Sequence, residues 1–283
     1  MEVKVIGVVG TGQMGQGIAQ TAAQSGFAVI MADQNLETAT KGLEKIKAQL
    51  AKLVEKQKMT ADQAAQTQKN LSAAASFSDL KNCDLVIEAV SENLALKKKI
   101  WVELDSVVKA TALFASNTSS ISITELAAAT KRPTQFAGMH FMNPVPIMKL
   151  VEGIRGIQTS TESFSVIRKT AEKMEKTFIE VKDFPGFAVN RILMPMINEA
   201  VYTLYEGIAS IEDIDAAMKL GTNQPMGPLT LADFIGLDTC LAIMEVLHDG
   251  LGDSKYRPCP LLKQYVTAGW LGRKSGRGFY NYG

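Results

Sequence analysis

The sequence predicts an α/β protein in two parts: a mostly parallel β-sheet, then an all-helical C-terminal domain. Short apolar runs alternate with helical segments as far as residue 181, which is typical of parallel strands joined by helices. After the break at residues 182–187 every periodic segment has helical spacing. With 283 residues, 46% of them hydrophobic, the chain can bury two cores. We therefore expect one domain at residues 1–185 and a second at residues 186–283.

The first apolar run leads into a glycine turn and a helix. Residues 5–9 are followed by Gly10-Thr11-Gly12-Gln13-Met14-Gly15. In such a unit the first glycine permits a tight turn, the second lets the backbone approach a pyrophosphate, and the third lets the helix pack close to the strand. Asp33 ends the next apolar run, where a carboxylate can bind the ribose of adenosine. The pattern predicts a Rossmann-type dinucleotide site; the alternative is a glycine turn without a ligand.

An insertion at about residues 35–70 is predicted to form an antiparallel pair of helices. The first, at residues 35–58, has an apolar face and an opposite basic face, and the second begins at Thr60. The basic face carries Lys41, Lys45, Lys52 and Lys56. A lysine stripe beside a nucleotide site could bind a polyanionic part of a substrate. The alternative is an ordinary solvated helix face.

The remaining segments extend the sheet to about eight strands. Strands are expected at residues 71–75, 84–90, 113–116, 135–141, 149–152 and 177–181, and helices at 94–108 and 163–176. Ser122-Ile123-Thr124-Glu125 matches a helix capping box. The C-terminal helices are expected at residues 188–206, 211–219, 228–249 with a break near Gly236, and 260–268. The first of these is apolar nearly all round, which favours a homodimer over a self-contained bundle.

Polar side chains collect where predicted strands end. Glu92 and Asn117 follow two of the strands, and Ser119 comes shortly after Asn117. Ligands bind at the carboxyl edge of an open α/β sheet, so these residues are site candidates. Turn and cap chemistry is the alternative, and we prefer it for Ser120 and Ser122.

The chain has two histidines, and they differ in context. His140 stands at a strand end, with Glu152 on a neighbouring element and Ser119 at another strand end, whereas His248 lies late in a helix. A base, a carboxylate that orients it and a hydrogen-bonding group beside a nicotinamide suit hydride transfer at a secondary alcohol. We expect His140 to be catalytic and His248 structural.

The composition argues against several classes of partner. The net charge is +1 without a basic arm, so neither nucleic acid nor an anionic membrane surface is expected. We see neither a signal peptide nor an apolar run of about 18 residues, and we expect a cytoplasmic protein. Cys83, Cys240 and Cys259 are far apart, so neither a disulfide framework nor a metal site is indicated.

Motifs along the whole chain resemble the L-3-hydroxyacyl-CoA dehydrogenase family, most closely its bacterial members that act at the butyryl level. They are the glycine motif, Ser116-Asn117-Thr118-Ser119-Ser120, His140-Phe141-Met142-Asn143-Pro144-Val145-Pro146, Pro185-Gly186-Phe187-Ala188-Val189-Asn190-Arg191, Lys219-Leu220-Gly221, Pro225-Met226-Gly227-Pro228 and Gly276-Arg277-Gly278-Phe279-Tyr280. The resemblance implies NAD as cofactor and the interconversion of acetoacetyl-CoA and (S)-3-hydroxybutyryl-CoA in butyrate or fatty-acid metabolism.

The resemblance also implies residue roles. His140 would be the catalytic base with Glu152 as its partner, and Ser119 and Asn190 would hydrogen-bond the reacting oxygen. Cofactor contacts are implied for Gly10, Gly12, Gln13, Met14, Gly15, Asp33, Glu92, Lys97, Asn117 and Asn143. The helix pair would hold CoA, for which Lys52 and Lys56 are the best matches. Because Asn190 lies in the helical domain, catalysis would require the two domains to meet.

Two other interpretations of the sequence are possible. A dehydrogenase of free hydroxy acids with a similar architecture typically uses a lysine base, whereas this chain has His140 with Glu152 and a basic insertion of the size that CoA needs. A structural protein recruited from the same family would still bind dinucleotide. The intact set of Ser119, His140, Glu152 and Asn190 argues against that second alternative.

Overall fold

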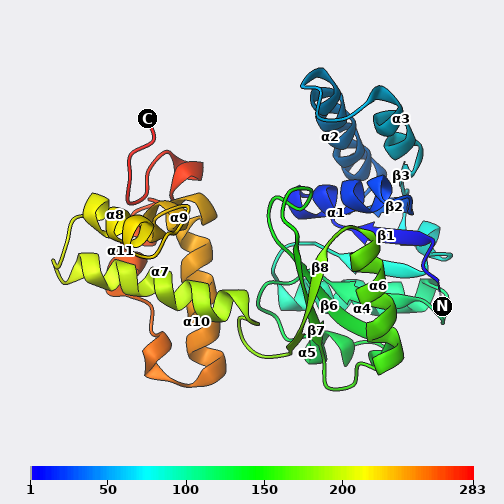
Figure 1. Ribbon diagram of the computed structural model, residues 1–283. Helices are drawn as coiled ribbons and strands as arrows, with labels where there is room; N and C mark the ends of the chain where they lie inside the picture. Colours follow the sequence, from blue (N-terminus) through cyan, green and yellow to red (C-terminus); the bar gives the residue numbers. More distant parts are fainter. Residues whose placement is uncertain (1) are drawn as a thin grey trace. The chain divides into compact units, whose positions relative to one another are not determined.

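The computed structural model describes residues 2–283, which divide into two compact units. The first unit ends at Asp183, and the second runs from Phe184 to Gly283. The first unit is built of strands and helices, whereas the second is helical (Figure 1). The predicted fold class, a mostly parallel sheet followed by an all-helical domain, is confirmed.

The first unit contains an eight-stranded sheet, as predicted, in the order β3-β2-β1-β4-β5-β6-β7-β8. The strands are β1 (Val5–Val9), β2 (Ala28–Ala32), β3 (Leu71–Ala73), β4 (Leu85–Glu88), β5 (Leu113–Ser116), β6 (Phe136–Phe141), β7 (Leu150–Arg155) and β8 (Thr177–Lys182). Strands β1 to β6 are parallel, β7 runs antiparallel to β6, and β8 is parallel to β7. The chain order reverses beside β1, and this switch point is where ligands bind in such sheets.

The helices of the first unit bury apolar side chains against the sheet. They are α1 (Gln13–Gln24), α2 (Leu36–Glu55), α3 (Ala61–Lys69), α4 (Leu94–Val107), α5 (Ile123–Ala127) and α6 (Thr161–Lys173). Ile6 of β1, Ile18 of α1 and Ile46 of α2 belong to one core and are fully buried. On α4 the ring of Trp101 lies 4.9 Å from that of Phe114 on β5, which fixes this helix on the sheet.

The insertion after β2 forms helices α2 and α3, which project from the body of the first unit (Figure 1). Asn35 caps α2 by accepting a hydrogen bond from the backbone N–H of Thr38, and Thr60 and Gln63 form a capping box on α3. Helix α2 ends at Glu55, earlier than the apolar periodicity predicted, because Gln57 takes a left-handed conformation with φ of 55°.

The predicted capping box at Ser122 is wrong in its second half. Ser122 does accept a hydrogen bond from the Glu125 N–H, but the Glu125 carboxylate pairs with Lys98 at 2.7 Å. Asp183 acts instead: its carboxylate accepts from the Ser122 hydroxyl at 2.7 Å and from the Ile123 N–H at 3.0 Å. The last residue of the first unit is thereby tied to the start of α5.

The second unit comprises α7 (Val189–Tyr205), α8 (Ile211–Gly221), α9 (Pro228–Ile235), α10 (Leu237–Leu251) and α11 (Pro260–Thr267). The predicted break near Gly236 is confirmed, because that glycine has φ of 105° and separates α9 from α10. Helix α7 is less uniform than its sequence suggested, since Met194 and Ile197 are buried in the bundle whereas Ile192 is 73% exposed. No helix within residues 2–283 is long and apolar enough to cross a bilayer.

Buried polar groups hold the C-terminal segment onto the bundle. The buried carboxylate of Asp233 accepts hydrogen bonds from the N–H groups of Phe279 and Tyr280, and the Tyr280 hydroxyl donates to Asp215 at 2.9 Å. All three cysteines are buried free thiols. Burial raises the pKa of Cys83 and of Cys240 to about 12, so both stay protonated at neutral pH.

Candidate active site

The glycine turn between β1 and α1 has the geometry that a pyrophosphate needs. Gly10 has φ of +95°, and a Cβ there would lie 2.6 Å from the carbonyl oxygen of Ala89. A Cβ on Gly15 would lie 1.8 Å from the carbonyl oxygen of Gly10, whereas one on Gly12 would meet no atom within 4 Å. Gly10 and Gly15 are therefore required by backbone packing, and the open space at Gly12 suits an approaching ligand.

The first turn of α1 is also electrostatically suited to an anion. Gly12 is its N-cap, no side chain caps the helix, and no acidic residue lies in the first turn, where Gln13 and Met14 stand. Such a helix start presents unpaired N–H groups and the positive end of the helix dipole. The turn borders a cavity of about 500 Å³ whose lining includes Asp33 and Val90.

Asp33 lies against the glycine turn. Its Oδ2 atom accepts hydrogen bonds from the N–H of Thr11 at 2.6 Å and from the Thr11 hydroxyl at 2.7 Å. Its Oδ1 atom accepts from the N–H of Gln34 at 2.8 Å. These bonds hold the carboxylate at the cavity wall, and Oδ1, which accepts a single hydrogen bond, keeps a lone pair for a ribose hydroxyl. The turn, the helix start and Asp33 together fit a dinucleotide.

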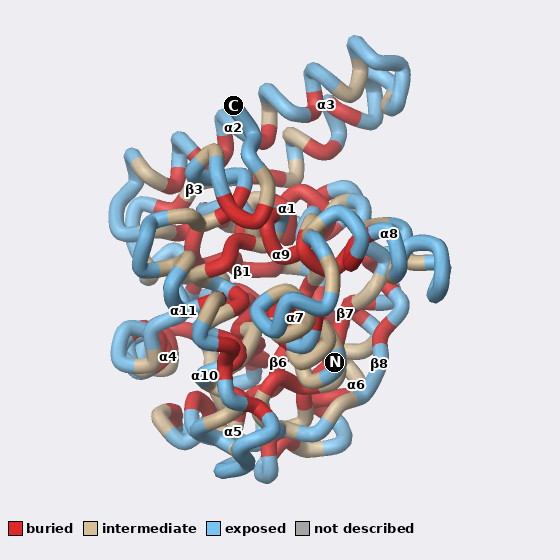
Figure 2. Tube along the Cα trace, turned by 90° about the vertical axis from the view of Figure 1, so that its left-hand side faces the viewer, coloured by how far each residue is buried: buried red, intermediate tan, exposed pale blue. Residues whose placement is uncertain are grey.

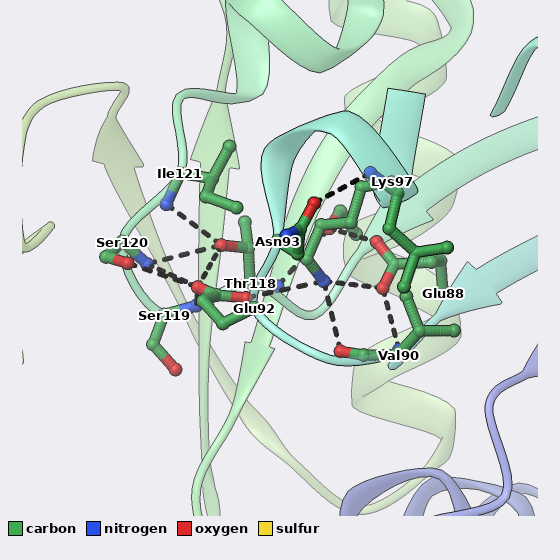
Figure 3. Close-up of polar contacts among 11 residues, drawn as sticks. Glu88, Val90, Glu92, Asn93, Lys97, Thr118, Ser119, Ser120 and Ile121 are labelled. Carbon is green, nitrogen blue, oxygen red and sulfur yellow. Dashed lines mark hydrogen bonds and ion pairs between the residues drawn. The ribbon is translucent and has the colours of Figure 1, made fainter. Parts of the chain in front are cut away.

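Glu92 and Lys97, both predicted near the nicotinamide half of the cofactor, form an ion pair (Figure 3). The Lys97 ammonium is 1% exposed and lies 3.3 Å from Oε2 of Glu92 and 2.5 Å from Oε1 of Glu88. Burial alone would raise the pKa of Glu92, but Lys97 and hydrogen bonds from Thr118 and Ser119 outweigh it, so this pKa lies below its usual range. Glu92 therefore stays ionised at neutral pH, and its contribution to stability is lost only in acid.

Glu88 is the residue of this cluster that the sequence analysis missed. It ends the apolar strand β4, and its side chain is fully buried. The sequence does contain a signal, because an acid at the end of a buried strand needs a partner and Lys97 follows on the next helix. The sequence alone does not show which positively charged residue is that partner.

Asn117 connects the ends of neighbouring strands. Its N–H donates to the carbonyl oxygen of Glu88 at 2.8 Å, and its Oδ1 accepts from the N–H of Phe141 at 2.9 Å. Phe141 is the residue after His140. The bonds of Asn117 therefore join the ends of β4, β5 and β6 at the edge where the candidate site lies.

His140 and Glu152 face one another across an antiparallel strand pair. The register of β6 and β7 places them directly opposite. The Nδ1 atom of His140 lies 2.7 Å from Oε2 of Glu152, with the histidine 6% exposed and the glutamate fully buried. A carboxylate at this distance makes Nδ1 the protonated ring nitrogen.

Other predicted residues are distributed over both units. Asn143 is exposed, and its Oδ1 accepts a hydrogen bond from the Gln13 side chain at 3.1 Å. Lys52 and Lys56 lie on the exposed side of α2 and at its C-cap. Asn190 belongs to the second unit, where it is buried in the first turn of α7.

Known proteins match this chain along its full length. Residues 5–184 match the NAD binding domain of 3-hydroxyacyl-CoA dehydrogenase, and residues 186–282 match its C-terminal domain. The chain is 59% identical over 282 residues to a protein of Bacillus subtilis named probable 3-hydroxybutyryl-CoA dehydrogenase, covering 100% of this chain and 98% of that one. It is 56% identical over 280 residues to 3-hydroxybutyryl-CoA dehydrogenase of Bradyrhizobium diazoefficiens, covering 99% and 96%.

A solved structure agrees in fold as well as in sequence. The crystal structure of (S)-3-hydroxybutyryl-CoA dehydrogenase PaaH1 from Ralstonia eutropha superposes with a TM-score of 0.97 at 50% identity, with both chains covered completely. The cofactor that the glycine turn and Asp33 fit is NAD, in agreement with the matched domain. The chain belongs to the 3-hydroxyacyl-CoA dehydrogenase family of NAD-dependent oxidoreductases.

Proposed function

We propose that this protein interconverts (S)-3-hydroxybutyryl-CoA and acetoacetyl-CoA, with His140 and Glu152 as its general acid/base pair. The observation that carries the proposal is the buried 2.7 Å contact between the two side chains, at the sheet edge where Asn117 and Glu92 also lie. The names of the similar proteins from Bacillus subtilis and Bradyrhizobium diazoefficiens support the choice of substrate.

The mechanism assigns a separate task to each member of the pair. NAD, when bound, supplies the hydride acceptor for oxidation and, in its reduced form, the hydride donor for reduction. In oxidation neutral His140 takes the hydroxyl proton at Nε2, and in reduction the imidazolium returns it to the developing alkoxide. Glu152 accepts the Nδ1–H bond, which fixes the tautomer and stabilises the imidazolium.

Two further side chains hydrogen-bond the reacting oxygen in this proposal, Ser119 in the first unit and Asn190 in the second. The backbone of Ser119 is fixed because its N–H donates to Glu92 at 2.8 Å. Figure 3 shows the side chain of Ser119 directed away from Glu92. A donor held in advance stabilises charge on the oxygen without reorganising during the reaction.

The CoA part of the substrate is assigned to the helix pair. Within residues 2–283, Lys41 and Lys47 of α2 form ion pairs with Glu37 and Glu44, whereas Lys52 and Lys56 have no acidic partner. Unpaired exposed ammonium groups can bind phosphates without first breaking an ion pair.

The proposal also includes a homodimer formed through the second unit. Ile192, Ile208 and Leu220 are 73%, 69% and 86% exposed, which is costly for large apolar side chains in water. Sedimentation at micromolar protein concentration should give twice the mass of one chain. An active monomer at that concentration would contradict this part of the proposal.

The activity is tested by the oxidation of NADH with acetoacetyl-CoA, followed by the loss of NADH absorbance. We expect turnover with acetoacetyl-CoA and little with free acetoacetate, because only the thioester brings the CoA phosphates to the helix pair. Turnover with the free acid alone would favour a hydroxy-acid dehydrogenase. No turnover with either substrate, together with measurable NADH binding, would favour a non-enzymatic protein.

A further inference from the structure

The buried acid Glu88 contacts Lys97 of the candidate site but was not predicted to be a site residue. It ends β4, is fully buried, and uses both carboxylate oxygens. Its Oε1 atom accepts from the Lys97 ammonium at 2.5 Å and from the N–H of Val90 at 2.8 Å, and its Oε2 accepts from the Ser116 hydroxyl at 2.7 Å. A carboxylate bonded in this way is held in one orientation.

Lys97 connects Glu88 to Glu92, a predicted residue of the site. Its ammonium lies between two carboxylates, 2.5 Å from Oε1 of Glu88 and 3.3 Å from Oε2 of Glu92. Lys97 is 1% exposed, so water does not replace a lost partner. Charges in such surroundings interact strongly, and Glu88 therefore sets the position from which Lys97 contacts Glu92.

Glu92 in turn accepts hydrogen bonds from the segment that contains Ser119. Its Oε1 atom accepts from the Thr118 hydroxyl at 2.5 Å, from the Ser119 N–H at 2.8 Å and from the N–H and hydroxyl of Ser120, each at 3.1 Å (Figure 3). One carboxylate oxygen of Glu92 thus accepts hydrogen bonds from all three residues of segment 118–120, which we call turn 118–120. Ser116, whose hydroxyl donates to Glu88, accepts from the N–H of Thr118 at 3.3 Å and so gives the turn a second connection to Glu88.

We propose that Glu88 is a positioning residue, which through Lys97 and Glu92 on one side and Ser116 on the other holds turn 118–120 in the conformation that presents Ser119 to the substrate. The consequence for turnover rests on the proposed function, in which Ser119 bonds the reacting oxygen. The consequence for the turn does not, because every contact in the chain of bonds is internal to the free protein.

The first test is Glu88→Gln, which keeps the size of the side chain and removes its charge. Among residues 2–283, Lys97 then keeps Glu92 as its one anionic partner, and Glu92 is no longer oriented through the ion pair of Glu88 with Lys97. We expect hydrogen exchange at the N–H groups of Ser119 and Ser120 to accelerate at least about tenfold in the free protein, while exchange in β1 stays unchanged. A displacement of Ser119 by about 1 Å should lower kcat about 10- to 100-fold, with a smaller change in KM for NADH.

The matched control is the neighbouring ion pair of the same helix. Lys98 follows Lys97 on α4 and pairs with Glu125 at 2.7 Å, but both side chains are more than one third exposed. Lys98→Met and Glu125→Gln should leave kcat and the exchange of Ser119 and Ser120 as they are, because exposed pairs contribute little. Equal effects at both pairs would show that any charge lost from α4 disturbs the turn, and would overturn the proposal.

A second variant distinguishes a loss of positioning from simple unfolding. Glu88→Gln leaves a buried cation short of one partner, whereas Glu88→Gln combined with Lys97→Met removes both charges of the pair, a change that proteins often tolerate. We expect the double variant to fold and still to exchange rapidly at Ser119 and Ser120. Normal exchange and normal kcat in either folded variant would overturn the proposal, and unfolding of both would make Glu88 a residue of the core alone. If wild-type protein fails to reduce acetoacetyl-CoA, the exchange result still decides the role of Glu88 in the turn.

Discussion

The carboxyl edge of the sheet and the helix pair α2–α3 use the same kind of side chain in opposite ways. At the sheet edge Lys97 is 1% exposed and lies between two carboxylates. On α2, Lys52 and Lys56 are exposed, and neither has an acidic partner within residues 2–283. Figure 2 shows that β1 and β6 are buried and that much of the far end of the helix pair is exposed.

Because of this difference, the two regions should affect different kinetic constants. Removing one partner of a buried ion pair costs about 3–5 kcal/mol, because the other charge stays behind without compensation. An exposed lysine contributes about 1 kcal/mol or less, and salt screens it. Residues at the sheet edge should therefore set the geometry of the reaction and change kcat. Residues of the helix pair should adjust affinity and change KM in a manner that depends on salt.

The largest effect is expected at His140. His140→Gln should lower turnover by about 10²- to 10⁴-fold while NADH binding persists, because a positioned acid or base supplies that factor. The matched control is His248→Gln: His248 is part-exposed near Asp249, and its loss should leave turnover unchanged. Turnover and melting temperature are measured on both variants. A folded His140→Gln enzyme with near-normal turnover would remove His140 from the mechanism.

The next effect concerns the choice of cofactor at Asp33. A carboxylate accepts hydrogen bonds from a free ribose 2′-hydroxyl but repels a 2′-phosphate, and residues 34–36 offer no arginine to receive one. We expect kcat/KM for NADH to exceed that for NADPH about 100-fold or more, a ratio that a repulsion of a few kcal/mol produces. Comparing the two cofactors with wild-type enzyme is preferable to replacing Asp33, which also holds Thr11. Equal efficiency with NADPH would contradict the assignment.

A smaller effect is expected at Glu152. Glu152→Gln keeps the shape of the side chain and removes the negative charge that faces the ring of His140 at 2.7 Å. Reduction of acetoacetyl-CoA should slow about tenfold while KM for NADH stays unchanged, because the proton donor loses its anionic partner. Measurements of kcat and of KM for NADH on the folded variant check this. A near-normal kcat would mean that Glu152 maintains only the shape of the site.

The order of elements could be predicted from the sequence because the strands of a parallel sheet are buried on both faces and appear as apolar runs. Each expected strand is present, with ends shifted by a few residues. Helix ends were predicted less well, because a left-handed residue such as Gln57 leaves no trace in apolar periodicity. The second half of the predicted capping box was wrong for a similar reason. The group that binds the start of α5 is Asp183, which is distant in sequence and near only in the folded chain.

Candidate site residues could be chosen from their place after predicted strands, but their contacts could not. The pairing of His140 with Glu152 depends on the antiparallel register of β6 and β7. The pairing of Lys97 with Glu88 depends on how α4 packs on the sheet, and the sequence around Lys97 offers other lysines at positions 98 and 99. Strand and helix patterns show which residues face inward. They do not show which two buried charges meet.

The smallest effect, and the one that tests the comparison most directly, is expected for Lys52 and Lys56. Replacing both with alanine should raise KM for acetoacetyl-CoA about three- to tenfold at low salt, since two screened contacts of about 1 kcal/mol or less each are lost. Values of kcat and of KM for NADH should stay unchanged, and the difference from wild type should shrink as salt is added. The matched control replaces Lys41 and Lys47, which already form ion pairs on the same helix and should therefore have less influence on KM. A double variant of Lys52 and Lys56 that binds acetoacetyl-CoA normally would make this face an ordinary solvated surface. A loss of kcat instead would mean that the helix pair, like the sheet edge, takes part in placing the reacting carbon.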